Sequence, residues 1–405
     1  MRNLDLREWT ATEEPVALSV RERDRLKPLL ASIEPAAGTS DAYYLRPGST
    51  IGALEIGDLS VAIEPKLPIG RLLYLASYAM GVDFREESFD FARRQTLIEA
   101  LVPALTRAAR RAFARGLLHG YRTEEEALHT VRGRIRVADQ IRRRFGVPLP
   151  VEIRYDDFTD DVLANRLVKA AADRLGKLRI RSAQSRLDLA WVAATLDNVS
   201  LVEFPPTTVP EVKFDRLNAH YREVVTLARL ILRHTSFEAA RGAVRANGFL
   251  MDMNDVFQEF VTRALREELR LSERAFRSDR RLPPIHLDTA GRVRLKPDLS
   301  WWNGLTCTFV GDAKYKRVKH AHVPNADLYQ LLAYTTALDL PGGLLVYAEG
   351  EADDVEHRVR HAGKQLEIAT LDLSGSIESL RSEVGRLAER VRALRRSAIE
   401  LRRAA

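Results

Sequence analysis

The sequence predicts an α+β protein in which a small β-rich module and a helical region precede a C-terminal domain of mixed helices and strands. Short β-type runs fill residues 1–70, helical periodicity follows, and after residue 245 helices alternate with β-branched runs. A chain of 405 residues that is 45% apolar is long enough for two or three domains with real cores. The predicted segments are residues 1–150, 151–245, 246–373 and 374–405.

Composition excludes several classes of protein. The chain has 63 basic and 56 acidic residues, so the placement of its basic residues matters more than their excess. Its single cysteine, Cys307, excludes an intrachain disulfide and a cysteine-based zinc site. The N-terminus is charged, and the longest apolar run, residues 72–80, is far shorter than the roughly 20 residues that span a membrane. We expect a cytoplasmic protein with no membrane association.

The first two segments combine a small sheet with helices. Alternating apolar residues and intervening glycines predict three short strands, at residues 43–45, 51–56 and 59–63. Helical spacing of apolar residues begins near residue 71. Two further helical stretches are separated by a proline-bearing connection, which makes residues 151–245 a helical middle region.

Residues 129–146 carry six arginines around Gly133. The arginine guanidinium is suited to bidentate phosphate contacts, and a glycine lets the backbone approach a ligand closely. We therefore expect Arg132 and Arg134 to contact the DNA backbone. Contact with a partner protein and a solvated arginine-rich helix remain open as alternatives, because the sequence does not separate them.

The C-terminal tail has apolar residues that alternate three and four apart from Ile377 to Leu401. This is a short heptad seam on a basic helix. Because it spans only about four heptads, we expect it to dock on the body of its own chain rather than on a partner.

Two β-type runs, residues 293–302 and 305–310, are joined by Asn303-Gly304, a strong hairpin signal. Asp298 lies midway along the first run, whereas Asp312 and Lys314 lie at the end of the second, two residues apart and therefore on one face. The sequence thus predicts a hairpin that carries two acids and a lysine.

The register of this hairpin decides whether the acids meet. A two-residue turn at residues 303–304 would pair Asp298 with Phe309 and place Asp312 on the opposite face of the sheet. We therefore expect a register shift, from a bulge at Gly311 or from a longer loop, that brings both acids to one face.

Two carboxylates and a lysine suit phosphodiester hydrolysis. A divalent metal polarises a phosphoryl oxygen and activates water, and Mg²⁺ prefers carboxylate and carbonyl oxygens. We expect Asp298, Asp312 and the Ala313 carbonyl to bind Mg²⁺, with Mn²⁺ as a substitute, and Lys314 to stabilise charge on the phosphate. The alternative is that these are ordinary strand-end carboxylates beside a solvated lysine.

A helix is predicted at residues 325–338, with Gln330 and Tyr334 four apart on one face. Pro297-Asp298, Asp312-Ala313-Lys314 and this pair together resemble the PD-(D/E)xK nuclease core in its variant with a Gln-x-x-x-Tyr helix. The runs GDAKYK and NADLYQLLAY resemble the McrC family more closely. The resemblance implies an αβββαβ nuclease domain in which Gln330 and Tyr334 position the catalytic groups or the DNA.

Other segments extend the resemblance over most of the chain, among them IGALEIGDLSVAIEPKLP, HTVRGRIRV and RYDDFTDDVLANRLVKAA. One departure concerns the helix before the hairpin, where the family usually has Phe-Glu and this chain has Phe257-Gln258. The amide of Gln258 can bind a water or a substrate oxygen but adds no negative charge. Gln258 is therefore a weaker catalytic candidate, and metal affinity is expected to be lower.

The resemblance also implies a partner and a reaction. McrC proteins are nuclease subunits of modification-dependent restriction systems and work with McrB, a GTP-hydrolysing ring protein. By resemblance, this chain is a Mg²⁺-dependent DNA endonuclease subunit in a heteromeric complex; its N-terminal half would engage the ring, and its C-terminal half would cleave modified DNA. The sequence contains no phosphate-binding loop of its own.

Basic residues surround the predicted acids, and we expect them to hold the DNA backbone with strong salt dependence. They are Arg294, Lys296, Lys316, Arg317 and Lys319. Two alternatives remain open. One is a stand-alone nuclease in repair or defence. The other is a DNA-binding or GTPase-activating scaffold whose cleavage was weakened by the loss of the helix acid.

Overall fold

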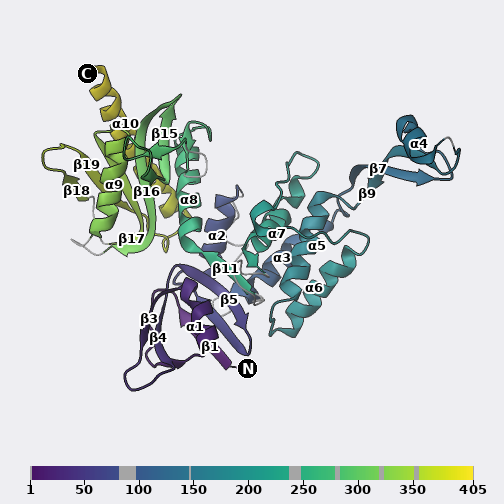
Figure 1. Ribbon diagram of the computed structural model, residues 1–405, viewed down its shortest axis with the longest axis horizontal. Coiled ribbons are helices and arrows are strands. Elements are labelled where there is room, and N and C mark those ends of the chain that lie inside the picture. Colours follow the sequence, from purple (N-terminus) through teal and green to yellow (C-terminus); the bar gives the residue numbers. More distant parts are fainter. Residues whose placement is uncertain are drawn as a thin grey trace. The chain divides into compact units, whose positions relative to one another are not determined.

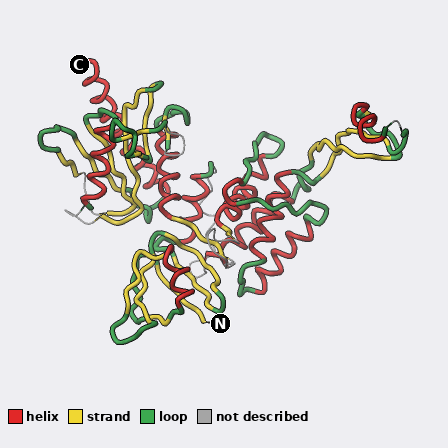
Figure 2. The backbone as a smooth tube through the Cα atoms, in the orientation of Figure 1, coloured by secondary structure: helices red, strands yellow, loops and turns green. Residues whose placement is uncertain are grey.

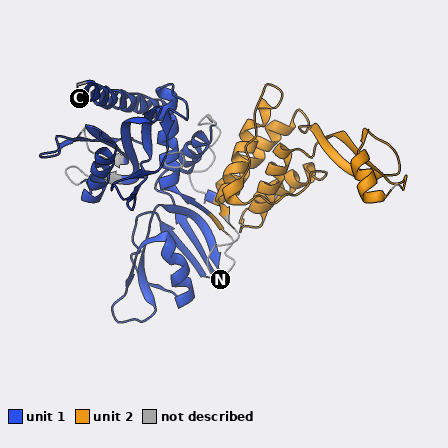
Figure 3. Cartoon of the chain, turned by 45° about the horizontal axis from the view of Figure 1, so that its top comes forward, with its two compact units in different colours: residues 1–97, 250–405 blue, residues 98–249 orange. Residues whose placement is uncertain are grey.

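The computed structural model describes residues 2–81, 97–145, 147–236, 248–278, 283–318, 323–350 and 355–404. The chain forms two compact units (Figure 3). Unit 1 comprises residues 1–97 and 250–405, and unit 2 comprises residues 98–249. The N-terminal module therefore belongs with the C-terminal domain, whereas the sequence-based division kept them in separate segments.

The N-terminal module of unit 1 contains two small sheets (Figures 1 and 2). In the first, the strands follow the order β1-β6-β5-β11, that is β1 (Arg2–Arg7), β6 (Leu59–Glu64), β5 (Thr50–Ile56) and β11 (Gly248–Asp252). The second has β2 (Val16–Ala17), β4 (Ala42–Pro47) and β3 (Leu30–Pro35), with helix α1 (Val20–Leu26) nearby. Alternate residues of β6 are buried, as the sequence pattern predicts. The three predicted strands are confirmed as parts of β4, β5 and β6.

Contacts between residues far apart in the sequence hold unit 1 together. The Ser49 hydroxyl donates a hydrogen bond of 2.9 Å to an Asp252 carboxylate oxygen, next to the start of α8. The Tyr78 hydroxyl donates one of 2.6 Å to Glu267. These bonds connect residues 1–81 to the C-terminal domain.

Unit 2 is mainly helical. Its α-helices are α3 (Leu97–Phe113), α4 (Val137–Arg144), α5 (Leu163–Gly176), α6 (Ala183–Thr195) and α7 (Arg222–His234). A three-stranded sheet in the order β7-β9-β8 comprises β7 (Gly120–Leu128), β9 (Val151–Thr159) and β8 (Arg134–Ile135), and helix α4 follows β8. The described residues of the unit also form the short elements η3 (Pro206–Thr208), η4 (Ala219–Tyr221) and β10 (Thr235–Ser236). The helical character predicted for residues 151–245 is confirmed from α5 onward.

Gly133, directly before β8, lies close to the backbone of β9. Its φ is +77°, and a Cβ added there would lie 2.4 Å from the Arg154 carbonyl oxygen and 2.6 Å from the Tyr155 Cβ. This close approach gives Gly133 a packing role, and its role in ligand approach stays a prediction.

We expect Gly133→Ala to destabilise the β7-β9-β8 sheet, because the new Cβ overlaps the backbone of β9 and the φ disfavours any side chain. Amide hydrogen exchange at Ile153 and Arg134 should become at least about tenfold faster, which corresponds to a local loss of about 1.4 kcal/mol. The matched control is Gly116→Ala, at a similar φ of +85° but with nothing within 4 Å of the added Cβ. Equal exchange rates in the two variants would refute the close-approach explanation.

The C-terminal domain of unit 1 is built on a six-stranded sheet in the order β12-β15-β16-β17-β19-β18. The strands are β12 (Phe276–Arg277), β15 (Leu299–Asn303), β16 (Thr306–Val318), β17 (Gly342–Gly350), β19 (Gln365–Thr370) and β18 (Val355–Arg358). Helices α8 (Met253–Glu268), α9 (Asn325–Ala337) and α10 (Ile377–Ala404) pack on it (Figure 1). The predicted helices before and after the hairpin are confirmed as α8 and α9.

The helices cover opposite faces of this sheet. A Cβ on Gly343 would lie 2.8 Å from Leu331 of α9, whereas one on the adjacent Gly342 would lie 3.2 Å from Leu394 of α10. Phe257 of α8 contacts Tyr315 of β16, with ring centroids 6.1 Å apart. Because Tyr315 and Lys314 are neighbours on one strand, α8 lies on the face opposite to the Lys314 side chain.

The predicted first strand of the hairpin is broken. It consists of β14 (Arg294–Leu295) and β15, and Pro297, which has no N–H for a sheet ladder, lies between them. Asp298 is therefore next to a strand end and not in mid-strand. The second strand is longer than predicted, so Asp312 and Lys314 lie inside β16 and not at its end.

The register shift exists, but neither predicted cause produces it. Asn303 pairs with Thr306, which moves the turn to Gly304-Leu305, and the bulge lies between Trp301 and Trp302. Gly311 pairs regularly with Leu299. Trp301 pairs with Phe309 and Trp302 with Cys307, so Thr308 is the additional residue. Its hydroxyl donates a hydrogen bond of 3.1 Å to the Trp301 carbonyl, which stabilises the bulge.

The C-terminal helix α10 docks on its own chain, as its heptad pattern predicts. The seam residues from Ile377 to Ala398 are buried, and the helix contacts α8, β16 and β17. Leu401, at the end of the pattern, is 52% exposed. Among the described residues, no helix is both long enough and apolar enough to cross a membrane.

Candidate active site

The bulge places the two predicted acids opposite each other. Because Leu299 pairs with Gly311, the next residues outward, Asp298 and Asp312, lie at the same level of the hairpin. Asp312 is 1% exposed, and an Asp298 carboxylate oxygen accepts a hydrogen bond of 3.1 Å from the Ala313 N–H. The structure therefore brings together all three predicted metal-binding positions.

Lys314 belongs to the same cluster. Its ammonium lies 2.6 Å from Asp312 Oδ2 and donates a hydrogen bond of 2.8 Å to the Gln330 side-chain oxygen. The Gln330 amide donates one of 2.6 Å to the Tyr334 hydroxyl, which donates one of 3.1 Å to the Lys296 carbonyl. A continuous hydrogen-bonded chain thus runs from Lys314 through both predicted residues of α9 to the chain just before Asp298.

Local folding rules explain this arrangement. Asp312 and Lys314 are two residues apart on β16 and face α9. Gln330 and Tyr334 are one helical turn apart on α9 and face the strand. Leu331 and Tyr334 are buried against Val310 of β16, which fixes α9 on the sheet.

Burial controls the charges of the cluster. Burial, reinforced by the negative charge of Asp312, raises the pKa of Asp298 to about 8. Burial also raises the pKa of Asp312. For Lys314, burial lowers the pKa, but the attraction of Asp312 and its neighbours outweighs burial and raises it. Without a cation, the acid pair therefore retains a proton at neutral pH while Lys314 stays charged.

The residues present fit a magnesium ion. Asp312 Oδ2 is buried, and the Lys314 ammonium lies 2.6 Å from it. The described residues contain no cluster of three or more His, Cys, Asp or Glu side chains suited to a metal. Mg²⁺ is typically bound by one or two carboxylates and keeps several waters. Asp298, Asp312 and the Ala313 carbonyl match that requirement.

We expect the affinity for Mg²⁺ to rise with pH between pH 6 and 8. A carboxyl group whose pKa is raised to about 8 must lose its proton before it binds a metal, so binding releases a proton below that pH. The association constant should increase by up to about tenfold per pH unit for one released proton. Calorimetric titration in two buffers with different ionisation enthalpies measures this proton release. An affinity that does not change across this range would show that the acids are already ionised.

Gln258 is placed less favourably than the other predicted catalytic residues. It is half-buried on α8, whose neighbouring Phe257 packs on the opposite face of the sheet from Lys314. On the same helix, Val256, Phe260 and Val261 are buried. The role of Gln258 stays a prediction.

The sequence interpretation missed Asp327. This residue of the first turn of α9 is 6% exposed, accepts a hydrogen bond of 2.6 Å from the Tyr347 hydroxyl and lies 2.6 Å from the Lys316 ammonium. Its negative charge also contributes to the raised pKa of Lys314. An acid in the first turn of a helix has an ordinary explanation at the sequence level, namely the helix dipole. Lys316, predicted to bind DNA, is thus held in an ion pair with a buried acid.

The other predicted DNA contacts fall in different places. Arg132 and Arg134 belong to unit 2, where Arg132 donates a hydrogen bond of 2.7 Å to Asp157. Arg294 and Lys296 are exposed in unit 1, beside the acids. Arg317 lies in β16, but its side chain is outside the described part of the structure, as is all of Lys319. Their DNA-binding roles stay predictions.

The fold and the site together define the class of protein. It is a mixed α+β protein whose C-terminal sheet carries paired aspartates and a lysine in an arrangement suited to a divalent cation. Residues 45–348 match the family model described as "McrBC 5-methylcytosine restriction system component". Since this match covers most of the chain, the protein belongs to that family.

Individual relatives agree with this placement. The chain is 22% identical to the "Type IV methyl-directed restriction enzyme EcoKMcrBC" of Escherichia coli (strain K12), over 76% of this chain and 94% of that protein. The fold resembles a solved structure described as "Refined half-complex from tetradecameric assembly of Thermococcus gammatolerans McrB AAA+ hexamers with bound McrC". That match has a TM-score of 0.60 and 17% identity and covers 96% of this chain and 100% of the other.

Proposed function

We propose that this protein is the Mg²⁺-dependent DNA endonuclease subunit of a McrBC-like, modification-dependent restriction complex, with a nuclease domain of the PD-(D/E)xK type. The observation that carries the proposal is the cluster in which Asp298, Asp312 and Lys314 meet on one face of the hairpin. Membership of the restriction-system family supports DNA as the substrate.

Each residue of the cluster has a role in the proposed hydrolysis. Asp298, Asp312 and the Ala313 carbonyl would hold the ion. When bound, Mg²⁺ supplies a Lewis acid that polarises the phosphoryl oxygen and activates water. Lys314 places a fixed positive charge where negative charge develops on the phosphate. Gln330 orients the Lys314 ammonium, and Tyr334 orients Gln330.

The proposed partner is a GTP-hydrolysing ring protein of the McrB type. The solved relative contains McrB AAA+ hexamers with bound McrC, and its fold matches this chain over nearly its whole length. In the proposed complex, this chain stimulates GTP hydrolysis by the ring and cleaves modified DNA, while the ring supplies nucleotide-driven movement.

A second candidate function is a DNA-binding or GTPase-activating scaffold with weakened cleavage. The observation that favours it is Gln258, a neutral amide where the resemblance leads us to expect an acid. Fewer negative charges at the metal would lower its affinity. A stand-alone nuclease that needs no nucleotide is the remaining alternative.

Plasmid cleavage by the full chain distinguishes these functions. The reaction is run on modified and unmodified DNA with and without Mg²⁺, GTP and the McrB-type ring protein from the same genome. The proposal predicts cleavage of modified DNA only when all three are present. Cleavage without GTP or ring would identify a stand-alone nuclease, whereas stimulated GTP hydrolysis without cleavage would identify the scaffold.

A further inference from the structure

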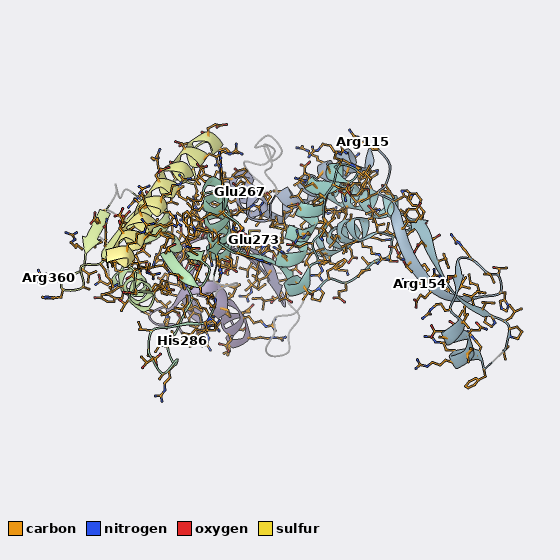
Figure 4. The ribbon with its side chains drawn as sticks, turned by 90° about the horizontal axis from the view of Figure 1, so that it is seen from above. Arg115, Arg154, Glu267, Glu273, His286 and Arg360 are labelled. Carbon is orange, nitrogen blue, oxygen red and sulfur yellow. The ribbon has the colours of Figure 1, made fainter. Side chains whose placement is uncertain are left out.

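A small two-stranded ribbon directly precedes Asp298 in the sequence. Strands β13 (Ile285–His286) and β14 (Arg294–Leu295) pair antiparallel, Ile285 with Leu295 and His286 with Arg294. The Leu287 N–H extends the pairing with a hydrogen bond of 2.9 Å to the Val293 carbonyl. We call residues 285–296 the basic ribbon, and the labelled His286 in Figure 4 marks its position.

The Asp288 side chain orders the turn at the tip of the basic ribbon. The Asp288 carboxylate accepts hydrogen bonds of 2.9 Å from the Arg292 N–H and 2.7 Å from the Val293 N–H. These backbone hydrogen bonds lower the pKa of Asp288. Gly291 has a φ of +67°, which the tight turn requires. The turn therefore holds the two strands in a defined register.

The two faces of the basic ribbon differ in chemistry. Ile285 is buried and Leu295 partly buried in the same apolar cluster as Leu331 and Tyr334 of α9. By strand alternation, the outer face carries His286 and Arg294 as a cross-strand pair, and Arg292 and Lys296 lie two residues to either side of Arg294, just outside the paired strands. Arg292, Arg294 and Lys296 are exposed. Three exposed cations thus recur at every second residue in the segment that directly precedes Asp298.

The base of the basic ribbon is fixed to the catalytic cluster. The Lys296 carbonyl accepts a hydrogen bond from the Tyr334 hydroxyl, and this hydroxyl also accepts one from the Gln330 amide. Asp298 follows two residues later. A polyanion held along the outer face would therefore be positioned relative to Lys314 through a short chain of hydrogen bonds.

We propose that the basic ribbon binds the phosphate backbone of DNA and guides the strand to be cut into the acid site. The proposal rests on the nuclease function proposed above and assigns the substrate-positioning surface for it. Cations two residues apart on a strand are roughly 6.6 Å apart, so that successive side chains can follow successive phosphates. Because backbone contacts carry no sequence information, the basic ribbon contributes affinity and alignment without reading bases.

The test removes three charges with little change in shape, by the combined variant R292Q/R294Q/K296Q. Binding of a short duplex to the full chain is measured by fluorescence anisotropy in EDTA, where no cleavage occurs, over a range of salt concentrations. If all three cations contact phosphates, the slope of log K against log salt should decrease in magnitude by about 2.7. With the ring protein, Mg²⁺ and GTP, kcat/KM should fall while kcat at saturating DNA is retained.

The matched control is R386Q/R396Q/R403Q, which removes the same charge from exposed positions of α10, on the opposite face of the sheet. Its salt slope should equal that of the wild type. Equal slopes for the basic ribbon variant and the wild type would overturn the proposal, as would equal losses in both variants or no DNA binding by the wild-type chain.

The binding and cleavage readouts separate this proposal from the nuclease function. Wild-type DNA binding that is reduced only in the basic ribbon variant, without any cleavage, would support the binding surface and refute the nuclease. Normal cleavage by the basic ribbon variant at limiting DNA would refute the positioning role and leave the nuclease intact.

Discussion

Replacing Lys314 by methionine is expected to slow DNA cleavage by about 10²- to 10³-fold, the loss typical for removal of one preorganised electrostatic stabiliser of a transition state. Methionine keeps the length and apolar stem of the side chain but removes the ammonium that lies 2.6 Å from Asp312 Oδ2. Single-turnover cleavage with the ring protein at saturating Mg²⁺ measures the effect.

Metal binding should survive this substitution. A cation next to Asp312 opposes a second cation, so its removal should leave Mg²⁺ affinity unchanged or increased. Lys27→Met, which removes an exposed lysine from the same unit, is the matched control and should cut at the wild-type rate. A Lys314→Met protein that cleaves as fast as this control would show that the ammonium has no catalytic role.

Replacing Asp327 by alanine is expected to destabilise unit 1 by roughly 3 kcal/mol, because it leaves the buried Tyr347 hydroxyl and the Lys316 ammonium without their shared acceptor. The expected loss is at the low end for a broken buried ion pair because the Lys316 side chain is 36% exposed and water screens its charge. Urea unfolding of the full chain, followed by tryptophan fluorescence, measures the loss.

Two variants separate the contributions at Asp327. Asp327→Asn keeps an acceptor for Tyr347 and should lose about half as much stability as Asp327→Ala. Glu356→Ala, at an exposed position of β18, should change the free energy of unfolding by less than about 0.5 kcal/mol. If Asp327→Ala were no more destabilising than Glu356→Ala, the contacts of Asp327 with Tyr347 and Lys316 would have no structural importance.

The sequence predicts which site residues share a face, because this depends only on strand and helix periodicity. The pairs are Asp312 with Lys314 on the strand and Gln330 with Tyr334 on the helix. Two residues on a strand or four on a helix share a face in any context. The confirmed positions of α8, α9 and α10 have the same origin, since long amphipathic stretches specify helices locally.

The position of the bulge could not be predicted because it depends on tertiary packing. Trp302 is buried, and its indole N–H donates a hydrogen bond of 2.8 Å to the Ser300 hydroxyl, so its side chain must point into the domain. Thr308 then takes the additional position and satisfies the Trp301 carbonyl. The Asn303-Gly304 signal suggested a turn, but the chain places Gly304, with φ +62°, as the first turn residue.

The role of Asp327 and the composition of unit 1 depend on contacts between distant residues. Asp327 meets Lys316 and Tyr347 only after α9 docks on β16 and β17. Residues 1–81 join the C-terminal domain through pairs such as Ser49 and Asp252, about 200 residues apart in the chain. Neither set of contacts produces a periodic pattern in a single sequence, so neither could be predicted from it.

The central claim, that this cluster cleaves DNA, is tested most directly by Asp312→Asn. Plasmid cleavage and GTP hydrolysis are measured together, with the ring protein, Mg²⁺ and modified DNA. The account predicts that the variant stimulates GTP hydrolysis as the wild type does, because the complex still assembles, but does not cut. Cleavage by Asp312→Asn at the wild-type rate would contradict the account and place the catalytic metal elsewhere.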